Sequence, residues 1–511
     1  MIKKYRLDSN CYYRIYDFKN RSGENLDDEL FKDDLKEYTD VWRKINSIYR
    51  EKTTIENKKS SICYLYSHEA SMLLKKFNDV TREYLEKQFD AIINSFDVKK
   101  NNFSYTKNRL HSWLRRVKKQ IILKRLCEFE FARLNGEEKL ILEYNEYDYG
   151  GKKKPVFSLK NKMFSFPLAV VNQQLKMKYS VCPADRNTVM NQLDLILRME
   201  KVNLGILRLD IKSFYENIPF DKVINKLEKD ALIDKSVLGV IKEVRNAIAE
   251  NAVYTSNNQD GKIGLPRGLS ISAYLSEYYM MDFDNSVRHL DNVVYYSRYV
   301  DDIIIVVCEV KDQENTNRLN IVEEETSKLL SNDNLEAYFN VKDKYNKSKK
   351  NISFDYLGYK ITRDDKTVTY SMSHSKMDKY KDRINSIFNA YLKVLRESDK
   401  KKYNKRLQEK RKKALKVLIL RLRLLTGRVL VPIIGGHTFI GISESYPLLP
   451  SNDNAIVELD NYLDDKIKKT GKLSTIFKEE KLFSKAFDPE HYYRIKPKRM
   501  GEVNRWVRDK G

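Results

Sequence analysis

Hydrophobic and polar positions follow two periods along this chain, and each period predicts one kind of element. Short runs of β-branched and aromatic residues, each as long as a strand, lie at Leu204–Ile211, Val293–Tyr299, Ile303–Val307 and Phe354–Ile361. So little chain separates the second run from the third that we expect these two strands to form a tight hairpin.

Longer segments show apolar residues at helical spacing. They predict helices at Glu69–Phe96, at Tyr105–Arg133 (one helix or a pair), from a start near Asp185 or Asn187, around Val322–Leu330, and at Lys376–Leu395, Tyr403–Leu425 and Asn454–Lys468. Another helix starts around Ser270, whose hydroxyl can cap it. The turn Gly150-Gly151, followed by Lys152–Lys154, predicts a second hairpin with a basic tip.

Three carboxylates stand at the ends of the predicted strands. Asp301 and Asp302 occupy the tip of the expected hairpin, and Asp210 lies near the end of an earlier strand. They can converge if the strands are neighbours in one sheet, and clustered carboxylates repel one another unless a cation compensates. Ligands that are all oxygen select Mg²⁺, with Mn²⁺ as the alternative. A surface turn that uses two Asp as turn residues would explain the pair equally well.

The charge and the cysteines restrict the class of protein. A formal charge of +24 over 511 residues attracts a polyanion, most often nucleic acid, although an AT-rich genome would also enrich lysine. No apolar run has the length of a membrane span, and the basic start shows no secretory signal. Five scattered cysteines form neither a disulfide framework nor a zinc motif, which fits a reducing cytoplasm. From these features together we expect a cytoplasmic protein that does not bind membranes.

Basic side chains in two places are candidates for phosphate contacts. Arg115, Arg116, Lys118 and Lys119 lie in the basic segment Tyr105–Arg133, where they either track a nucleic acid backbone or form a solvated helix face. Arg186, at the start of its predicted helix, is a candidate phosphate ligand.

Five segments, in order, resemble the motifs of reverse transcriptases of the group II intron and retron lineage. LDIKSFYENIP resembles motif A, GLPRGLSISAYLSEYY motif B and YVDD motif C, and KDKY and FDYLGYKI resemble motifs D and E. Together they run from Leu204 to Ile361. The resemblance implies an α/β (α+β) right-hand polymerase with a ferredoxin-like palm, fingers and an α-helical C-terminal domain.

On this resemblance the chain divides into four parts. We expect an N-terminal helical region at 1–100, fingers at 101–200, a palm with motifs A to E at 201–372, and a basic α-helical thumb-like or helical-repeat domain at 373–511.

The resemblance also assigns roles to residues. Asp210, Asp301 and Ile211 would bind metal, with Asp302 assisting. Tyr215 falls at the steric-gate position that excludes a 2′-OH, and the loop with Gly268 suits close backbone approach to a nucleotide or template–primer. The remaining nucleotide-binding candidates are Phe214, Arg267 and Arg186, with Phe214 otherwise an ordinary buried aromatic, and Lys344 is the candidate acid for pyrophosphate, with Lys342 or Lys347 as alternatives.

Departures from the usual motifs narrow the resemblance. Arg267 replaces the usual Gln of motif B, and Leu269–Ser272 replaces its Ser-Pro. GLSIS and LSEYYMMDFD, with RLRLLTGR and GISESYPLL further on, are instead similar to bacterial abortive-infection and other defence-associated reverse transcriptases.

That second similarity implies antiphage defence and synthesis that starts on a protein hydroxyl. We expect RNA-directed or template-independent DNA synthesis from dNTPs. The expected partners are nucleic acid, such as a non-coding RNA template or scaffold, a second copy of the chain and a second defence protein. The alternatives are a retron or group II intron enzyme that copies a structured RNA, and a non-catalytic scaffold that binds nucleic acid.

Overall fold

The chain is described from a computed structural model, in which its residues cluster into two compact units. The structure describes residues 7–21, 26–51, 53–95, 103–149, 152–199, 203–257, 261–308, 318–333, 335, 337–345, 351–364, 367–399, 405–433, 436–470, 473, 477 and 481–494. One unit comprises Met1–Glu143, Leu159–Gln173 and Asp234–Ala247, and the other comprises the rest of the chain. Among the described residues, no helix is long and apolar enough to cross a membrane.

The first unit is helical. Its elements are α1 (Ser9–Arg21), α2 (Leu26–Leu30), α3 (Lys36–Arg50), α4 (Ile55–Leu65), η2 (Tyr66–Ala70), α5 (Ser71–Leu74), α6 (Asp79–Asn94), α7 (Phe103–Leu134), η3 (Lys162–Phe164) and most of α8 (Ser165–Tyr179) and α12 (Lys235–Ala249). Trp113, about 1% exposed, packs with Tyr66 and Phe89 in the core and donates a hydrogen bond to the Leu85 carbonyl. The basic segment predicted as one helix or a pair is the single helix α7.

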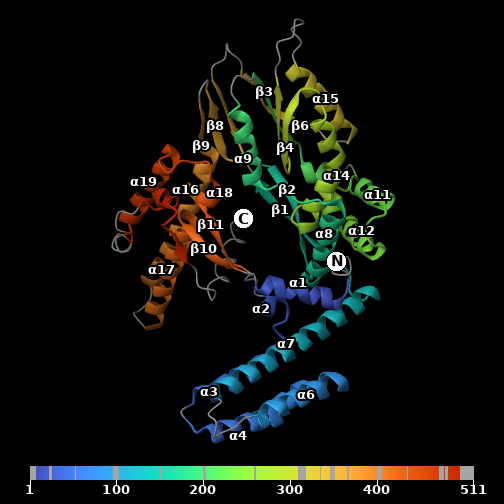
Figure 1. The fold of residues 1–511 in the computed structure, drawn as a ribbon, viewed down its shortest axis with the longest axis vertical. Helices are drawn as coiled ribbons and strands as arrows, with labels where there is room; N and C mark the ends of the chain where they lie inside the picture. Colours follow the sequence, from blue (N-terminus) through green and yellow to red (C-terminus); the bar gives the residue numbers. More distant parts are fainter. Residues whose placement is uncertain are drawn as a thin grey trace. The chain divides into compact units, whose positions relative to one another are not determined.

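The second unit contains a four-stranded sheet in the order β4-β5-β3-β6. Three of its strands, β3, β4 and β6, are labelled in Figure 1. Its strands are β3 (Leu204–Ile211), β4 (Val293–Tyr299), β5 (Asp302–Cys308) and β6 (Ala337–Tyr345), and all neighbours are antiparallel. The predicted hairpin is therefore confirmed as β4-β5. Since side chains alternate between the faces, Ile206, Ile304 and Val306 share the face that packs on α9 (Arg186–Leu197).

Helices complete this part of the second unit. They are α10 (Phe214–Asn217), α11 (Phe220–Asp230), α13 (Ala252–Asn257), α14 (Ser270–Arg288) and α15 (Arg318–Asn332), and the strands β1 (Leu142–Tyr149) and β2 (Lys152–Leu159) form the predicted basic hairpin. Tyr295 of β4 donates to the Val189 carbonyl of α9, whereas the next residue, Tyr296, bonds Asp284 of α14. Helices α9 and α14 therefore cover opposite faces of the sheet.

The segment predicted as one strand, Phe354–Ile361, is a hairpin. It spans β7 (Ile352–Tyr356) and β8 (Tyr359–Arg363), which form a three-stranded sheet with β9 (Val368–Met372). Both turn residues have positive φ, +46° at Leu357 and +84° at Gly358, as a two-residue turn between antiparallel strands requires. Leucine rarely adopts this conformation, which is why a run of apolar residues concealed the turn.

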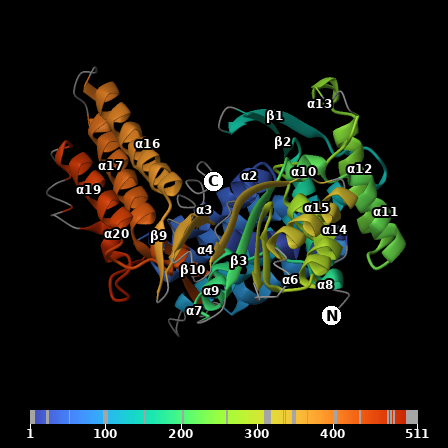
Figure 2. The same ribbon diagram turned by 90° about the horizontal axis from the view of Figure 1, so that it is seen from above.

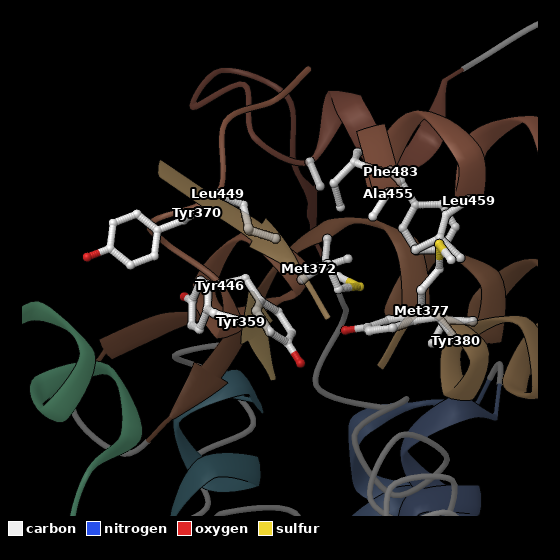
Figure 3. Close-up of a cluster of buried hydrophobic side chains, with 14 of the residues drawn as sticks. Tyr359, Tyr370, Met372, Met377, Tyr380, Tyr446, Leu449, Ala455, Leu459 and Phe483 are labelled. Carbon is white, nitrogen blue, oxygen red and sulfur yellow. The ribbon is translucent and has the colours of Figure 1, made fainter. Parts of the chain in front are cut away.

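The remaining chain is mostly helical, as expected, and adds a small sheet that the sequence did not suggest. Its helices are α16 (His374–Asp399), α17 (Lys405–Thr426), α18 (Ile442–Ser445), α19 (Asn454–Lys468) and α20 (Leu482–Lys485), and its strands are β10 (Arg428–Ile433), β11 (Gly436–Gly441) and β12 (Tyr493–Arg494). Helices α16 and α17 run side by side (Figure 2). A cluster of buried aromatic side chains joins β8 to α16, α18 and α20 (Figure 3). It contains Tyr359, Tyr380, Tyr446 and Phe483.

Candidate active site

The sheet brings Asp210 beside the tip of the β4-β5 hairpin. Strands β3 and β5 are neighbours, and Asp210 stands directly opposite Asp302. The Ile211 N–H donates a 3.0 Å hydrogen bond to the carbonyl of Asp301, which fixes the hairpin tip to the end of β3. The predicted convergence of the three carboxylates required their strands to be neighbours in one sheet, and β3 and β5 are neighbours. Because the Ile211 side chain is 1% exposed, only its backbone could face a bound ion.

Burial and the neighbouring carboxylates change the pKa of Asp210. Burial, followed by the charges of Asp301 and Asp302, raises that pKa from 3.8 to about 6. Arg208 and Lys154 act against this rise, so the Lys154 ammonium of β2 lies within electrostatic reach of the carboxylates. Negative charge in this place is unfavourable without a compensating cation.

Asp302 differs from the other two carboxylates because an arginine binds both of its oxygens. Arg208 Nε donates to Oδ1 at 3.0 Å, and Arg208 Nη2 donates to Oδ2 at 3.1 Å. Arg208 precedes Asp210 by two residues on β3, so both side chains emerge from the same face of the strand. Its Nη1 also donates to the Asp355 carbonyl on β7 at 2.6 Å. Asp302 is thus the least available ligand of the three.

The donor set fits a hard divalent cation that keeps part of its own coordination sphere. Among the residues that the structure describes, no group of three or more His, Cys, Asp or Glu side chains is arranged to hold a metal ion. Asp210 and Asp301 remain as two carboxylates, whose mutual repulsion a cation would relieve. Mg²⁺ commonly binds through one or two carboxylates and completes its shell with water and substrate phosphates.

The raised pKa predicts that Asp210→Asn stabilises the metal-free protein at neutral pH. A group whose pKa rises on folding contributes its full stability below pH 3.8, and this contribution is lost as pH rises through about 6. Removing the charge should therefore raise the free energy of unfolding by on the order of 1 kcal/mol at pH 7.5, since solvent screens part of the effect. Thermal melts in a chelator should show a smaller gain at pH 5. The exposed Asp291→Asn is the matched control, and an equal gain at both pH values would contradict the assignment.

The loop before α14 makes close backbone contacts on two sides. A Cβ at Gly264 would lie 2.2 Å from the Glu216 carbonyl oxygen, and one at Gly268, where φ is +99°, would lie 2.5 Å from that of Phe157. The expected close approach at these glycines is therefore made to the protein's own backbone. Ser270 is the first residue of α14 and does not cap it, because the N-cap is Leu269 and no side chain bonds there.

The ring of Tyr215 lies against the ion pair between Arg267 and Glu216 at this loop. Arg267 donates to Glu216 at 3.0 and 3.3 Å, and its guanidinium carbon stands 5.3 Å from the centre of the Tyr215 ring. The Leu265 N–H also donates to the Tyr215 carbonyl at 2.8 Å. Arg267 thus holds a neighbouring side chain in position, and its guanidinium is already paired with a carboxylate. Burial raises the pKa of the Tyr215 phenol.

Two other predicted nucleotide contacts serve packing in this structure. Phe214 is about 1% exposed, which agrees with the alternative that it is a buried aromatic. Arg186 Nε donates to the Leu357 carbonyl at 2.9 Å, Nη1 bonds the Ser445 carbonyl, and the guanidinium carbon lies 4.1 Å from the centre of the Tyr446 ring. These contacts tie α9 to the β7-β8 turn and α18, so the structure does not present Arg186 to the carboxylates.

The structure describes only the backbone of Lys344 and of its alternative Lys342. The register of β6 sets Lys344 opposite Gly205, five residues from Asp210 on β3 and roughly 16 Å along the strand. The structure therefore does not bring the Lys344 backbone to the carboxylates. Its side chain, that of Lys342 and all of Lys347 lie outside the described residues.

The basic residues of α7 have partners within the first unit. Arg116 bonds Gln88, Lys118 pairs with Asp27, and the Lys119 ammonium lies 5.3 Å from the centre of the Tyr13 ring. Arg115 Nε donates to the His111 carbonyl within the same helix. These contacts engage three of the four side chains with other helices, and a role in binding phosphates stays a prediction.

Sequence reasoning missed four charged residues: Arg208, Glu216 and Lys154 at the site, and Arg298 of β4, which donates a 3.0 Å hydrogen bond to the Val300 carbonyl at the hairpin tip. Two of them carried a signal, because Arg208 and Arg298 interrupt apolar strands just before the aspartates. A charged side chain inside a buried strand requires a partner. Glu216 carried no comparable signal, since its ion pair connects segments far apart in sequence. Lys154 had been noted only as part of a basic hairpin.

Residues 156–361 match the family model described as reverse transcriptase (RNA-dependent DNA polymerase). The chain therefore contains a reverse transcriptase domain and is an RNA-directed DNA polymerase, a nucleotidyltransferase. The expected right-hand polymerase fold is confirmed. No curated protein matches the sequence.

Solved structures with similar folds are distant. Telomerase from Candida albicans, in a complex with a fragment of telomeric RNA, is 10% identical, with a TM-score of 0.33 over 93% of this chain and 94% of the other. Apo telomerase from Candida tropicalis is 11% identical, with a TM-score of 0.30 over 66% and 90% of the two chains. At this distance the similarities define neither substrate nor assembly.

Proposed function

We propose that this enzyme joins dNTPs into DNA at Asp210 and Asp301 by two-metal phosphoryl transfer, as part of a bacterial antiphage defence system. The observation that carries the catalytic proposal is the pairing of Asp210 with Asp302 across neighbouring strands, which places three carboxylates at one end of the sheet. The metal would be Mg²⁺, with Mn²⁺ as the alternative.

The side chains divide the work of the reaction. Mg²⁺, when bound, would neutralise charge on the triphosphate and lower the pKa of the attacking hydroxyl. Asp210 and Asp301 supply the ligands, while Arg208 keeps Asp302 oriented at their side. Lys154, whose positive charge lowers the pKa of Asp210, is suited to contact the triphosphate. Tyr215 presents an aromatic ring that would exclude a 2′-OH.

The defence role is supported by sequence resemblance. The segments GLSISAYLSEYYMMDFD and GISESYPLL, which resemble defence-associated reverse transcriptases, form α14 and the region around α18. We propose that the enzyme works on nucleic acid in the bacterial cytoplasm, with a non-coding RNA as template or scaffold. A second copy of the chain and a second defence protein are its proposed protein partners.

Incubation of the purified protein with each labelled nucleotide tests this function. With its co-purifying RNA retained, the protein should incorporate dNTPs in a reaction that needs Mg²⁺, and the product should carry a defined sequence. Removal of the RNA beforehand should stop templated synthesis, whereas continued synthesis of a random product would indicate a template-independent enzyme. A product whose gel mobility changes after protease digestion would have started on a protein hydroxyl.

Asp301→Asn is the control for contaminating polymerases. Absence of incorporation with every nucleotide and RNA tested, by protein that melts cooperatively and binds nucleic acid, would favour the non-catalytic scaffold. Loss of phage protection in cells that express Asp301→Asn at parental levels would support the defence role. Unchanged protection by that variant would separate defence from synthesis.

A further inference from the structure

The tip of the β4-β5 hairpin has an unusual backbone conformation immediately before Asp301. Val300 has a φ of +61°, in the left-handed region that β-branched residues rarely occupy. Such a conformation persists only where surrounding contacts impose it. The conformation of Val300 sets the direction in which the chain enters Asp301, so whatever holds Val300 also aims that carboxylate.

Arg298 provides a contact of this kind. Its Nη1 donates a 3.0 Å hydrogen bond to the Val300 carbonyl. The Arg298 side chain is 2% exposed. Since Tyr296 and Arg298 both bond α14, Arg298 lies on the α14 face of the sheet, whereas Asp210 and Asp302 lie on the α9 face. The Arg298 guanidinium carbon also lies 5.9 Å from the centre of the Phe214 ring, and the bond to the Val300 carbonyl is its direct contact with the hairpin tip.

Two acidic residues of α14 fix the guanidinium. Nη1 and Nη2 donate to the two carboxylate oxygens of Glu277 at 3.1 and 2.8 Å, and Nε and Nη2 donate to those of Asp284 at 2.9 and 2.8 Å. With the bond to Val300, all five N–H donors of Arg298 have an acceptor. The Tyr296 hydroxyl also donates to Asp284 at 2.5 Å. A helix thus holds the guanidinium rigidly, and the guanidinium holds the tip.

We propose that Arg298 is a positioning residue for polymerisation, which keeps Val300 in its left-handed conformation so that Asp301 is directed toward Asp210. The inference rests on the proposed function of Asp301 as a metal ligand. The competing interpretation is that the buried ion pairs only join α14 to β4. The two interpretations differ at Val300, because glycine adopts a positive φ without strain and would need the clamp less.

The test combines Arg298→Lys with Val300→Gly. Lysine keeps the charge near Glu277 and Asp284 but cannot reproduce the five-donor fork, so the bond to Val300 should be lost. Arg298→Lys should raise the Mg²⁺ concentration needed for half-maximal rate by about tenfold or more, as loss of support around a metal ligand does. Val300→Gly alone should change it by less than about threefold. In the double variant, most of the loss caused by Arg298→Lys should be recovered.

A neutral variant covers the case in which Arg298→Lys does not fold. Arg298→Met with Glu277→Gln and Asp284→Asn removes the clamp without leaving a buried charge unpaired. It should show the same increase in half-saturating Mg²⁺ concentration and the same recovery by Val300→Gly. A double or quadruple variant that melts like the parent but recovers nothing would overturn the proposal. So would an unchanged Mg²⁺ requirement in the folded Arg298 variants.

Failure of the proposed function would look different. If Asp301→Asn incorporated dNTPs at the parental rate, the assigned metal site would be wrong whatever Arg298 does. If Asp301→Asn were inactive while Val300→Gly gave no recovery, the site would stand and the clamp would be rejected.

Discussion

Asp301→Asn should lower the rate of nucleotide incorporation by about 10³-fold or more while the protein remains folded. An amide cannot supply the charge that a divalent cation requires, and the Asp301 side chain is not among the groups that Arg208 neutralises. The Asp301→Asn, Asp302→Asn double variant should be equally inactive. Single-turnover incorporation of a labelled dNTP at saturating Mg²⁺ measures the effect, and a thermal melt checks the fold.

Asp302→Asn alone should be the milder change. Both oxygens of Asp302 accept hydrogen bonds from Arg208, so its charge serves mainly that ion pair, and we expect a loss of about 10- to 100-fold. Asp291→Asn, at an exposed turn before β4, is the matched control and should have the parental rate. Equal activity of Asp301→Asn and Asp291→Asn would show that the reaction takes place elsewhere.

The central strands could be predicted because their signal is local. Alternating and continuous apolar runs define β3, β4 and β5 within a residue or two, and the short connection leaves a hairpin as the simplest geometry. Once β3 and β5 are taken as neighbours, no further information is needed to predict that Asp210 lies at the hairpin tip. The same logic located α9, where Asp185 caps the helix through the Thr188 N–H.

The roles of the arginines could not be predicted, because they depend on partners far away in the sequence. Arg186 was predicted to be a phosphate ligand at a helix start, yet its bonds reach Leu357 and Ser445. Arg267 was predicted as a nucleotide-binding candidate and as a substitution in motif B, yet it pairs with Glu216 in motif A. Neither contact has a period or a spacing that a sequence pattern could reveal.

Turns with unusual backbone conformations form the other class of misses. A positive φ at Val300 and at Leu357 goes against the preference of each residue, so tertiary contacts must decide it. Local reasoning therefore found the two strands around Val300 but not the strain between them, and it merged β7 with β8 across Leu357 and Gly358.

Tyr215→Ala should make the enzyme accept ribonucleotides. Two contacts hold Tyr215 in place. Its backbone carbonyl accepts a hydrogen bond from the Leu265 N–H, and the Arg267 guanidinium lies over the face of its ring. A ring held in this way excludes a 2′-OH by contact alone, so its removal should lower the preference for dNTP over rNTP by about 100-fold. The ratio of kcat/KM values for dGTP and GTP measures the preference.

Tyr215→Phe is the matched control, because it keeps the ring and removes only the hydroxyl. It should retain the parental preference, since a steric barrier depends on the ring and not on a hydrogen bond. Arg267 and Glu216 remain paired in both variants, so the loop before α14 keeps its anchor to motif A. A preference that survives in Tyr215→Ala, or that falls equally in Tyr215→Phe, would place the discrimination against ribose in other residues.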